Sequence, residues 1–433
     1  MGPGFFPLDE ELELGPGGLT PNLAEDLVLL GSWMPFAEAA KLLEHFRKVG
    51  VSASTVRRIT ERSGEAYVEV QRAQVEVLEK EMPQSPPGPT RQQLSVDGAM
   101  VPLVHKEWAE VKTLAIGTLG EAVGEGESPE VHAREMSYFS RLGEHQSFAR
   151  LATVETHRRG TERAGRVCAV VDGAEWQQKF IDLHRPDAVR ILDWGHAAEH
   201  LAKAGQAALG AGTAAASEWL GTQLHQLKHG DPQEALGQLR ELSRELESAA
   251  GADCEALKVV KGSLEYLEKR REQIRYAEFQ AMGYPIGSGA VESANKLVVE
   301  ARLKGSGMHW ARDHVNPMVA LRNIVCSDRW EEAWPQISQQ IGEKAKEQAA
   351  ARRPKPNQER PTVEQARSSR VEAGPILQRS KLLTSRDVQN QLNTNGDRPA
   401  QRRRPPAANH PWRRMSVGRN GSLKPNQLAS AKL

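Results

Sequence analysis

Cysteine is scarce in this sequence. Its 433 residues include three cysteines, Cys168, Cys254 and Cys326, and no two of them form a CxxC pair. The spacings typical of a disulfide framework and of a cysteine-based zinc site are therefore missing. Long hydrophobic runs are missing as well, since no stretch approaches about 18 consecutive apolar residues, and we expect no membrane-spanning helix. The first residues contain no basic and then apolar leader, which argues against secretion and favours a cytoplasmic location.

Net charge is also small, at +1, but the charges are distributed unevenly. Residues 351–433 hold 18 lysines and arginines against 5 acidic residues, a net charge of +13 that leaves −12 for residues 1–350. This tail is rich in Pro, Asn, Gln and Ser, so we expect residues 346–433 to be disordered. Such a tail is typical of proteins that bind a polyanion, most often nucleic acid, although it can also be a solubilising appendage.

The amino-terminal part contains a helical pattern that suggests DNA binding. Apolar residues repeat at helical spacing before Gly50, and Ser52 or Ser54 can cap the helix that follows it. A helix, a glycine-containing turn and a basic helix are typical of a helix-turn-helix, although any helical hairpin can look similar. The candidate DNA contacts on the second helix are Arg57, Arg58 and Arg62.

The centre of the chain alternates between strand and helix patterns. Three strand patterns are followed by a helix, and then by two apolar strands, RVCAVVDG and AVRILDWGH, each with a helix after it. We therefore expect an α/β fold with a mixed sheet covered by helices. The predicted organisation is a loop at 1–18, a helical DNA-binding region at 19–81, a linker at 82–90, a core at 91–196 and 282–345, and a helical segment at 197–281 between the two parts of the core.

Three acidic residues stand out from this pattern. Asp97-Gly98 and Asp172-Gly173 follow apolar strand runs, and Glu292 comes early in a helix after the glycine-rich segment YPIGSGAVES. Carboxylates at the carboxyl ends of strands project into the crevice where α/β proteins place ligands. Singly, each of them is also what an ordinary turn or helix start contains. If the three converge, hard divalent cations such as Mg²⁺ are the ligands that carboxylates suit best.

Several segments resemble one known family. SVDGAMVPL, EWAEVKTLAIGTL, VVDGAEWQQ, RILDWGHAAEHL, YPIGSGAVESANKLVVEARLKGSGMHWA and VNPMVALRNIVCSDRWEEAWP are similar to the insertion-sequence transposases of the ISKra group, within the Mutator-like DDE transposases. The resemblance covers roughly residues 5–345, together with HPWRR in the tail. It implies an RNase H-like fold that is interrupted by an all-helical insertion before the last acid.

The resemblance also implies roles for particular residues. Asp97, Asp172 and Glu292 would hold two Mg²⁺ or Mn²⁺ ions, with Asp193 as the competing choice for the second acid. The resemblance places a Cys-x-x-His-like element after that acid, and Asp193 to His196 occupy its position here. His196 could bind a phosphate or metal together with His200, or instead pack on the sheet and orient Asp193.

Other residues are candidates for contact with DNA. Lys296 could grip the DNA backbone, and the softer candidates are Asn295, Arg302 and Lys304, although all four could simply solvate their helix. Three tryptophans could stack on an unpaired base, although such residues more often belong to a core: Trp176, Trp194 and Trp310.

The function implied is a DNA transposase that binds terminal inverted repeats, cleaves a strand and joins it to target DNA, as a dimer or higher oligomer on the DNA. The alternatives are a non-catalytic protein that occupies element ends and represses transposition, and an RNase H-like nuclease without strand transfer. The chain departs from the family at its start, because related transposases have paired cysteines just before a segment like Gly4–Asp9. We therefore expect either a chain that begins at an internal start or a chain from a truncated copy of the element.

Overall fold

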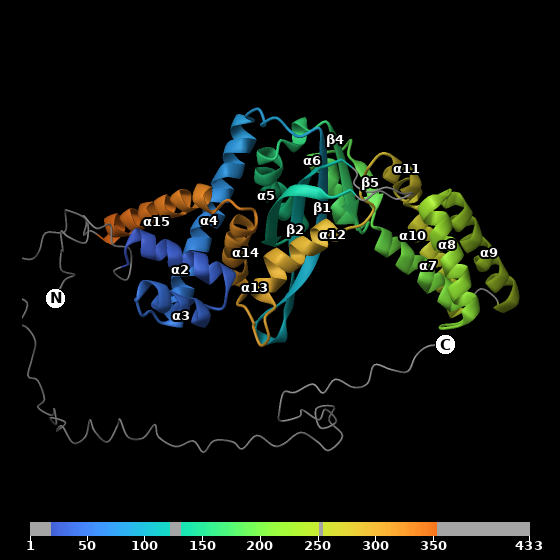
Figure 1. Cartoon of the computed structure of the whole chain (residues 1–433), viewed down its shortest axis with the longest axis horizontal. Helices are drawn as coiled ribbons and strands as arrows, with labels where there is room; N and C mark the ends of the chain where they lie inside the picture. Colours follow the sequence, from blue (N-terminus) through green and yellow to red (C-terminus); the bar gives the residue numbers. More distant parts are fainter. Residues whose placement is uncertain (1–18, 122–130, 251–253, 353–433) are drawn as a thin grey trace, which may run out of the picture. The chain divides into compact units, whose positions relative to one another are not determined.

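The structure, a computed structural model, describes residues 19–121, 131–250 and 254–352 (Figure 1). The predicted loop at 1–18 and most of the predicted tail lie outside these residues. In the part of the chain that is described, no helix is both long enough and apolar enough to cross a membrane.

A five-stranded mixed sheet forms the centre of the fold, as the strand patterns predict. Its strand order is β3-β2-β1-β4-β5. The first three strands are antiparallel neighbours, whereas β4 and β5 run parallel to β1. The strands are β1 (Arg91–Pro102), β2 (Trp108–Leu119), β3 (Ala133–Leu142), β4 (Arg166–Val171) and β5 (Val189–Leu192).

Strand β1 is longer than the sequence suggests. The pattern predicts a strand that ends at Asp97-Gly98, but β1 continues to Pro102 because it stays paired with β2, with Gly98 opposite Lys112. Its parallel neighbour β4 ends earlier, at Val171. Asp97 therefore lies inside a strand, at the level where the parallel half of the sheet stops.

Helices cover both faces of the sheet. On one face, α5 (His145–Arg158) and α6 (Glu175–His184) bury an apolar cluster that includes Val96, Phe148 and Phe180. On the other face, α12 (Gly289–Ala294) packs on β1 and β2, the π-helix η4 (Asn295–Glu300) packs on β1, and α14 (Arg312–Cys326) packs on β3. Their apolar cluster includes Val101 and Val298. Figure 1 shows α5 and α12 on opposite sides of the strands.

The amino-terminal helices match the predicted helical pattern. They are α2 (Pro21–Trp33), α3 (Phe36–Arg47) and α4 (Ala53–Glu81). Of the two candidate caps, Ser52 is the one used, since its hydroxyl accepts a hydrogen bond from the Thr55 N–H at 3.1 Å. These helices share an apolar cluster with α14 and α15 (Trp330–Arg352), so the region is packed onto the carboxyl-terminal helices.

The described residues of the segment predicted to be helical, 197–281, form helices and no strand. The segment comprises α7 (Trp194–Leu209), α8 (Ala214–His229), α9 (Pro232–Ala250), α10 (Glu255–Glu268), the short η3 (Arg271–Gln273) and α11 (Tyr276–Ala281). Figure 1 shows α7 to α10 gathered in a bundle after β5. Leu201, Leu236, Leu239 and Val260 bury the inside of this bundle in one cluster with β4 and β5.

Two predictions near the carboxyl end are wrong. A single helix from Trp310 to about Trp334 is predicted, but α14 ends at Cys326 and α15 begins at Trp330, with Asp328 between them at a left-handed φ of 54°. The tail was also expected to start at residue 346, whereas α15 continues to Arg352.

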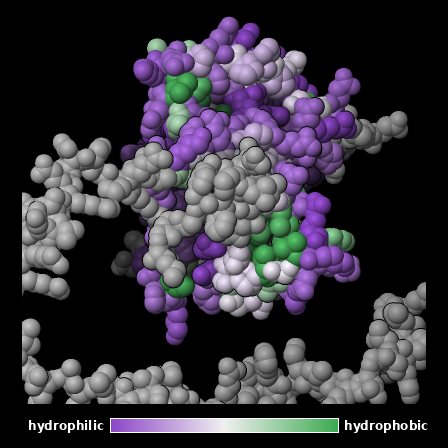
Figure 2. Space-filling view, turned by 90° about the vertical axis from the view of Figure 1, so that its left-hand side faces the viewer, coloured by the Kyte–Doolittle hydropathy of each residue, from purple (hydrophilic) through white to green (hydrophobic). Residues whose placement is uncertain are grey.

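The outer surface beside these helices is polar. Figure 2 views the side of the molecule that lies at the left of Figure 1, where α2, α3 and α15 are found. Hydrophilic residues dominate that face, and apolar residues form small separate patches.

Candidate functional site

Three aspartates meet at the carboxyl ends of the parallel strands. The ladder pairs Leu94 of β1 with Ala169 of β4, and Val171 of β4 with Leu192 of β5. Asp97 lies three residues beyond Leu94, and Asp172 lies three beyond Ala169. Asp172 directly follows Val171, and Asp193 directly follows its partner Leu192. Because neighbouring strands are about 4.8 Å apart, this register places the three residues side by side across the sheet.

The first two aspartates also share a face. Val96 and Val171 belong to the apolar cluster under α5 and α6. Successive side chains of a strand alternate between faces, so Asp97 and Asp172, one residue further on, belong to the opposite face. Both side chains are half-buried. We call the face of Val96 and Val171, covered by α5 and α6, the dry face, and the face of Asp97 and Asp172 the acid face.

The surroundings of Asp97 disfavour the charged form of its carboxylate. Burial raises the pKa of Asp97 above its ordinary value and the charge of Asp172 raises it further. Hydrogen bonds from the Gly98 N–H and from the Asn295 amide, and the charge of His196, oppose that rise only in part. The Asn295 Nδ2 donates to Asp97 Oδ2 at 2.8 Å. The pair of acids is therefore a place where a cation would relieve an unfavourable interaction.

Asp193 is held differently from the other two. It is buried, and its carboxylate accepts hydrogen bonds from the His196 N–H at 2.9 Å, from His196 Nδ1 at 3.0 Å and from the Ser288 N–H at 2.6 Å. Burial alone would raise the pKa of Asp193, but these hydrogen bonds outweigh it and lower the pKa. Asp193 thus caps α7, orients His196 and anchors the glycine-rich loop before α12.

His196 is the member of this group whose charged form is favoured. The hydrogen bond to Asp193 raises the pKa of His196, burial opposes the rise, and the charges of Asp193 and Asp172 add to it. His196 hydrogen-bonds Asp193, as the role of orienting Asp193 requires. His200, one turn further along α7, instead stacks its ring on Tyr266, with the centroids 3.8 Å apart.

Glu292 lies on α12, the helix that packs on the face of the sheet to which Asp97 belongs. Its side chain is exposed and accepts a hydrogen bond from the Ser288 hydroxyl at 2.6 Å. Ser288 thereby links Glu292 to Asp193, and Asn295, three residues further on, links the same helix to Asp97. Among the described residues, no group of three or more His, Cys, Asp or Glu side chains is arranged to hold a metal ion.

The donor chemistry still suits a hard cation. Asp97 and Asp172 supply adjacent carboxylates, and the Oδ1 of Asn295 is a buried oxygen with no hydrogen-bond partner. A buried acceptor without a partner is costly unless something binds it, and this one belongs to the side chain that donates to Asp97. Oxygen ligands of this kind are those that Mg²⁺ and Mn²⁺ prefer.

The helix that carries these groups contains a feature that sequence reasoning missed. Residues Asn295–Glu300 form a π-helix, a rare form that is frequent at functional sites. The buried Arg322 donates to the carbonyls of Leu297 and Val298 within it. The spacing of Glu292 and Asn295 was a usable signal, since residues three apart share a helix face.

The predicted DNA contacts fall into two groups. Lys296, Lys304, Arg57 and Arg58 are exposed, and Arg62 is partly exposed. Arg57, Arg58 and Arg62 line a hollow of about 550 Å³ at the start of α4. Asn295 and Arg302, in contrast, are buried.

Burial changes the role of two predicted contacts. The Arg302 guanidinium donates to the Gly31 carbonyl and lies over the rings of Phe36 and Trp310, so it holds helices together and is not presented to DNA. Trp310 is itself buried, and its indole N–H donates to the Leu303 carbonyl at 3.1 Å. Its core interpretation therefore fits better than base stacking.

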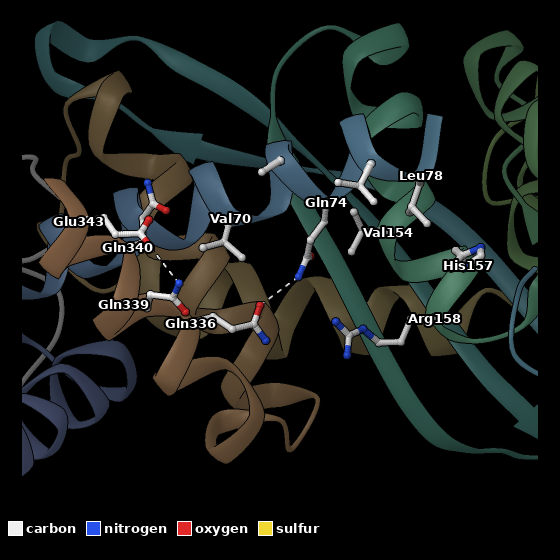
Figure 3. Close-up of a pocket in the computed structure, with 12 residues that line it drawn as sticks. Val70, Gln74, Leu78, Val154, His157, Arg158, Gln336, Gln339, Gln340 and Glu343 are labelled. Carbon is white, nitrogen blue, oxygen red and sulfur yellow. Dashed lines mark hydrogen bonds between the residues drawn. The ribbon is translucent and has the colours of Figure 1, made fainter. Parts of the chain in front are cut away.

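Another cavity is lined by none of the three aspartates. A groove of about 540 Å³ between α4, α5 and α15 is lined by Val70, Leu78, Val154 and several glutamines. Figure 3 shows His157 and Arg158 at one end of it and Glu343 at the other. Its charged groups are thus apart, and no arrangement for acid–base or metal chemistry is apparent there.

The chain matches no protein-family model, and no curated protein matches it either. The function proposed therefore rests on the residues, their geometry and the resemblance of the sequence segments.

Proposed function

We propose that this protein is a DDE transposase of the ISKra group, with an RNase H-like core interrupted by the helical segment α7–α11. The observation that carries the proposal is the placement of Asp97 and Asp172 side by side on one face of the sheet. The order of elements also supports it: three antiparallel strands, a helix, two parallel strands, a helical segment and then the helix with Glu292.

Each acid has a place in the proposed mechanism. Asp97, Asp172 and Glu292 would hold two Mg²⁺ or Mn²⁺ ions, which supply an activated water and neutralise developing charge in phosphoryl transfer. Asn295 orients the Asp97 carboxylate by a hydrogen bond. Asp193 orients His196 so that its imidazole stays next to Asp172. Catalysis then consists of positioning and charge stabilisation, without a covalent protein intermediate.

Binding of DNA is assigned to separate surfaces. The exposed Arg57 and Arg58 at the start of α4 would contact the terminal inverted repeats, and Lys296 and Lys304 would contact the backbone near the acids. Two DNA ends require at least two copies of the chain in the synaptic complex. We propose a cytoplasmic protein that acts on the nucleoid.

The test is a nicking assay on DNA that contains the element ends, with Mn²⁺ or Mg²⁺. Asp97→Asn, Asp172→Asn and Glu292→Gln should each lower the rate of strand cleavage by at least about 100-fold, because each removes charge stabilisation from the transition state. DNA binding, measured by a mobility shift, should stay near the wild-type level.

Asp193→Asn is the matched control. It should impair cleavage less than Asp172→Asn, since Asp193 already accepts three hydrogen bonds and acts through His196. The reverse order would show that Asp193 is the second acid. A wild-type protein that binds ends without cutting would instead be the end-binding repressor, and one that cuts without joining pre-cleaved ends would be a nuclease.

A further inference from the structure

The loop that follows β4 is held from the helical segment. This loop consists of Asp172 and Gly173, directly before α6. The hydroxyl of Tyr266, on α10, donates a hydrogen bond to the backbone carbonyl of Asp172. Arg270, just after α10, donates through Nη2 to the carbonyl of Gly173 at 2.7 Å. Two consecutive carbonyls of the loop are thus bound by side chains that lie almost a hundred residues away in sequence.

The two side chains are themselves fixed in place. The Arg270 guanidinium lies over the Tyr266 ring at 3.7 Å from its centroid, and its Nη1 donates to the Tyr266 carbonyl at 2.9 Å. The His200 ring stacks on Tyr266 as well, nearly parallel at 11°. Stacking and cation–π contacts restrict the rotation of the tyrosine, so its hydroxyl is held at one position.

Gly173 is fitted to this arrangement. Its φ of +85° favours glycine, and a Cβ at this position would lie 2.3 Å from Arg270 Nε. The glycine of the Asp172-Gly173 pair therefore serves more than the turn, because it lets the guanidinium approach the backbone directly behind the acid.

We propose that Tyr266 and Arg270 are positioning residues for Asp172, so that the helical segment forms part of the acid site. This inference rests on the proposed function. The two residues bind the backbone of the loop, while the Ala174 N–H donates to Asp172 Oδ1 at 2.9 Å and fixes the side chain. Together these contacts determine where the Asp172 carboxylate lies relative to Asp97. Groups that orient a metal ligand typically change metal affinity when they are removed.

The experiment measures Mn²⁺ binding to the full chain, from the electron paramagnetic resonance signal of free Mn²⁺, without DNA. Tyr266→Phe removes one hydroxyl and keeps the stacked ring. It should weaken Mn²⁺ binding about 10-fold, the lower end for loss of a group that supports a metal ligand. Arg270→Lys, which keeps the charge and loses the forked geometry, should weaken binding in the same direction.

Tyr276→Phe is the matched control. The Tyr276 hydroxyl also donates to a carbonyl at the end of a strand, that of Leu192 at 3.0 Å, but the next residue is Asp193 and not a proposed metal ligand. This variant should bind Mn²⁺ like the wild type. Equal weakening by the two substitutions would mean that Tyr266 has only a structural role and would overturn the inference.

A double substitution separates this inference from the proposed function. In the Asp172→Asn background, at Mn²⁺ concentrations that load the variant, Tyr266→Phe should have no further effect, because it acts through Asp172. An undiminished effect there overturns the positioning role alone. Unchanged Mn²⁺ binding in both Asp97→Asn and Asp172→Asn would overturn the proposed metal site, and the inference with it.

Discussion

The two faces of the central sheet are built from the same strands, and both bury apolar residues, but they differ at the level of Asp97 and Asp172. Val96 and Val171 point into an apolar cluster with Phe148 and Phe180, where the rings of Phe148 and Phe180 stack at 5.4 Å. The next residues along each strand, Asp97 and Asp172, belong to the face of α7 and α12. A shift of one residue in strand register would exchange the two faces, so the packing of the dry face also determines where the acids lie.

Two histidines illustrate the same contrast. His184, on the dry face, is half-buried beside the Phe180 ring and its Nε2 donates to the Ala149 carbonyl at 2.9 Å. Burial lowers the pKa of His184 to about 4. His196, on the acid face, has its pKa raised by the hydrogen bond to Asp193. The surroundings therefore keep one imidazole neutral and favour the charged form of the other.

The largest expected change in the free energy of unfolding comes from a substitution on the dry face. Phe148→Ala should lower the free energy of unfolding by about 3–5 kcal/mol, because a fully buried ring is replaced by a cavity. Phe46→Ala, at a side chain that is 71% exposed, is the control and should change it by less than about 0.5 kcal/mol. Denaturant titration measures both. A small loss for Phe148→Ala would mean that the dry face does not determine the fold of the acid face.

Much of this architecture is predictable from the sequence. The apolar runs before Asp172 and Asp193 predict β4 and β5, and the alternation in 110–119 predicts β2. The helical pattern of residues 197–281 predicts the segment after Asp193, and the helix starting after Ser52 follows from its cap. These signals are local, since they depend on residues close in sequence.

What could not be predicted depends on contacts between distant segments. The length of β1 beyond Asp97 comes from pairing with β2, and the burial of Arg302 comes from Phe36 and Gly31, more than 260 residues earlier. The bond from Asn295 to Asp97 and the bond from Tyr266 to the Asp172 loop are of the same kind. Sequence periodicity carries no information on such pairs.

The next largest effect is the change of the free energy of unfolding with pH that His184 causes. The unfolded chain takes up a proton on this imidazole near its ordinary pKa of 6.5, whereas the folded chain keeps it neutral until about pH 4. Falling pH therefore favours the unfolded state, and stability present above pH 6.5 is lost as the pH falls to 4. The loss from this group approaches about 3 kcal/mol below pH 4.

His184→Gln is the variant that isolates this term, since an amide can keep the hydrogen bond to Ala149 and does not titrate. The free energy of unfolding, measured from pH 7.5 to 4, should fall less steeply in the variant than in the wild type. Parallel pH profiles would show that His184 does not supply the difference.

The smallest expected effect on the free energy of unfolding comes from Asp97 on the acid face. Its pH dependence has the opposite sign to that of His184. Since the folded pKa of Asp97 is raised, its contribution to stability is fully present below the ordinary pKa and is lost as the pH rises through the folded value. At pH 7 the ionised carboxylate next to Asp172 therefore costs stability. Asp97→Asn should raise the free energy of unfolding at pH 7, by less than about 1 kcal/mol, although it should lower the proposed metal-dependent cleavage by at least about 100-fold. The gain should disappear at pH 3, where Asp97 is protonated, and in the presence of saturating Mn²⁺, which stabilises only the protein that binds it. A loss of stability at pH 7 would mean that the hydrogen bonds from Gly98 and Asn295 outweigh burial and the charge of Asp172, and the acid pair would then be a structural feature like the buried arginines.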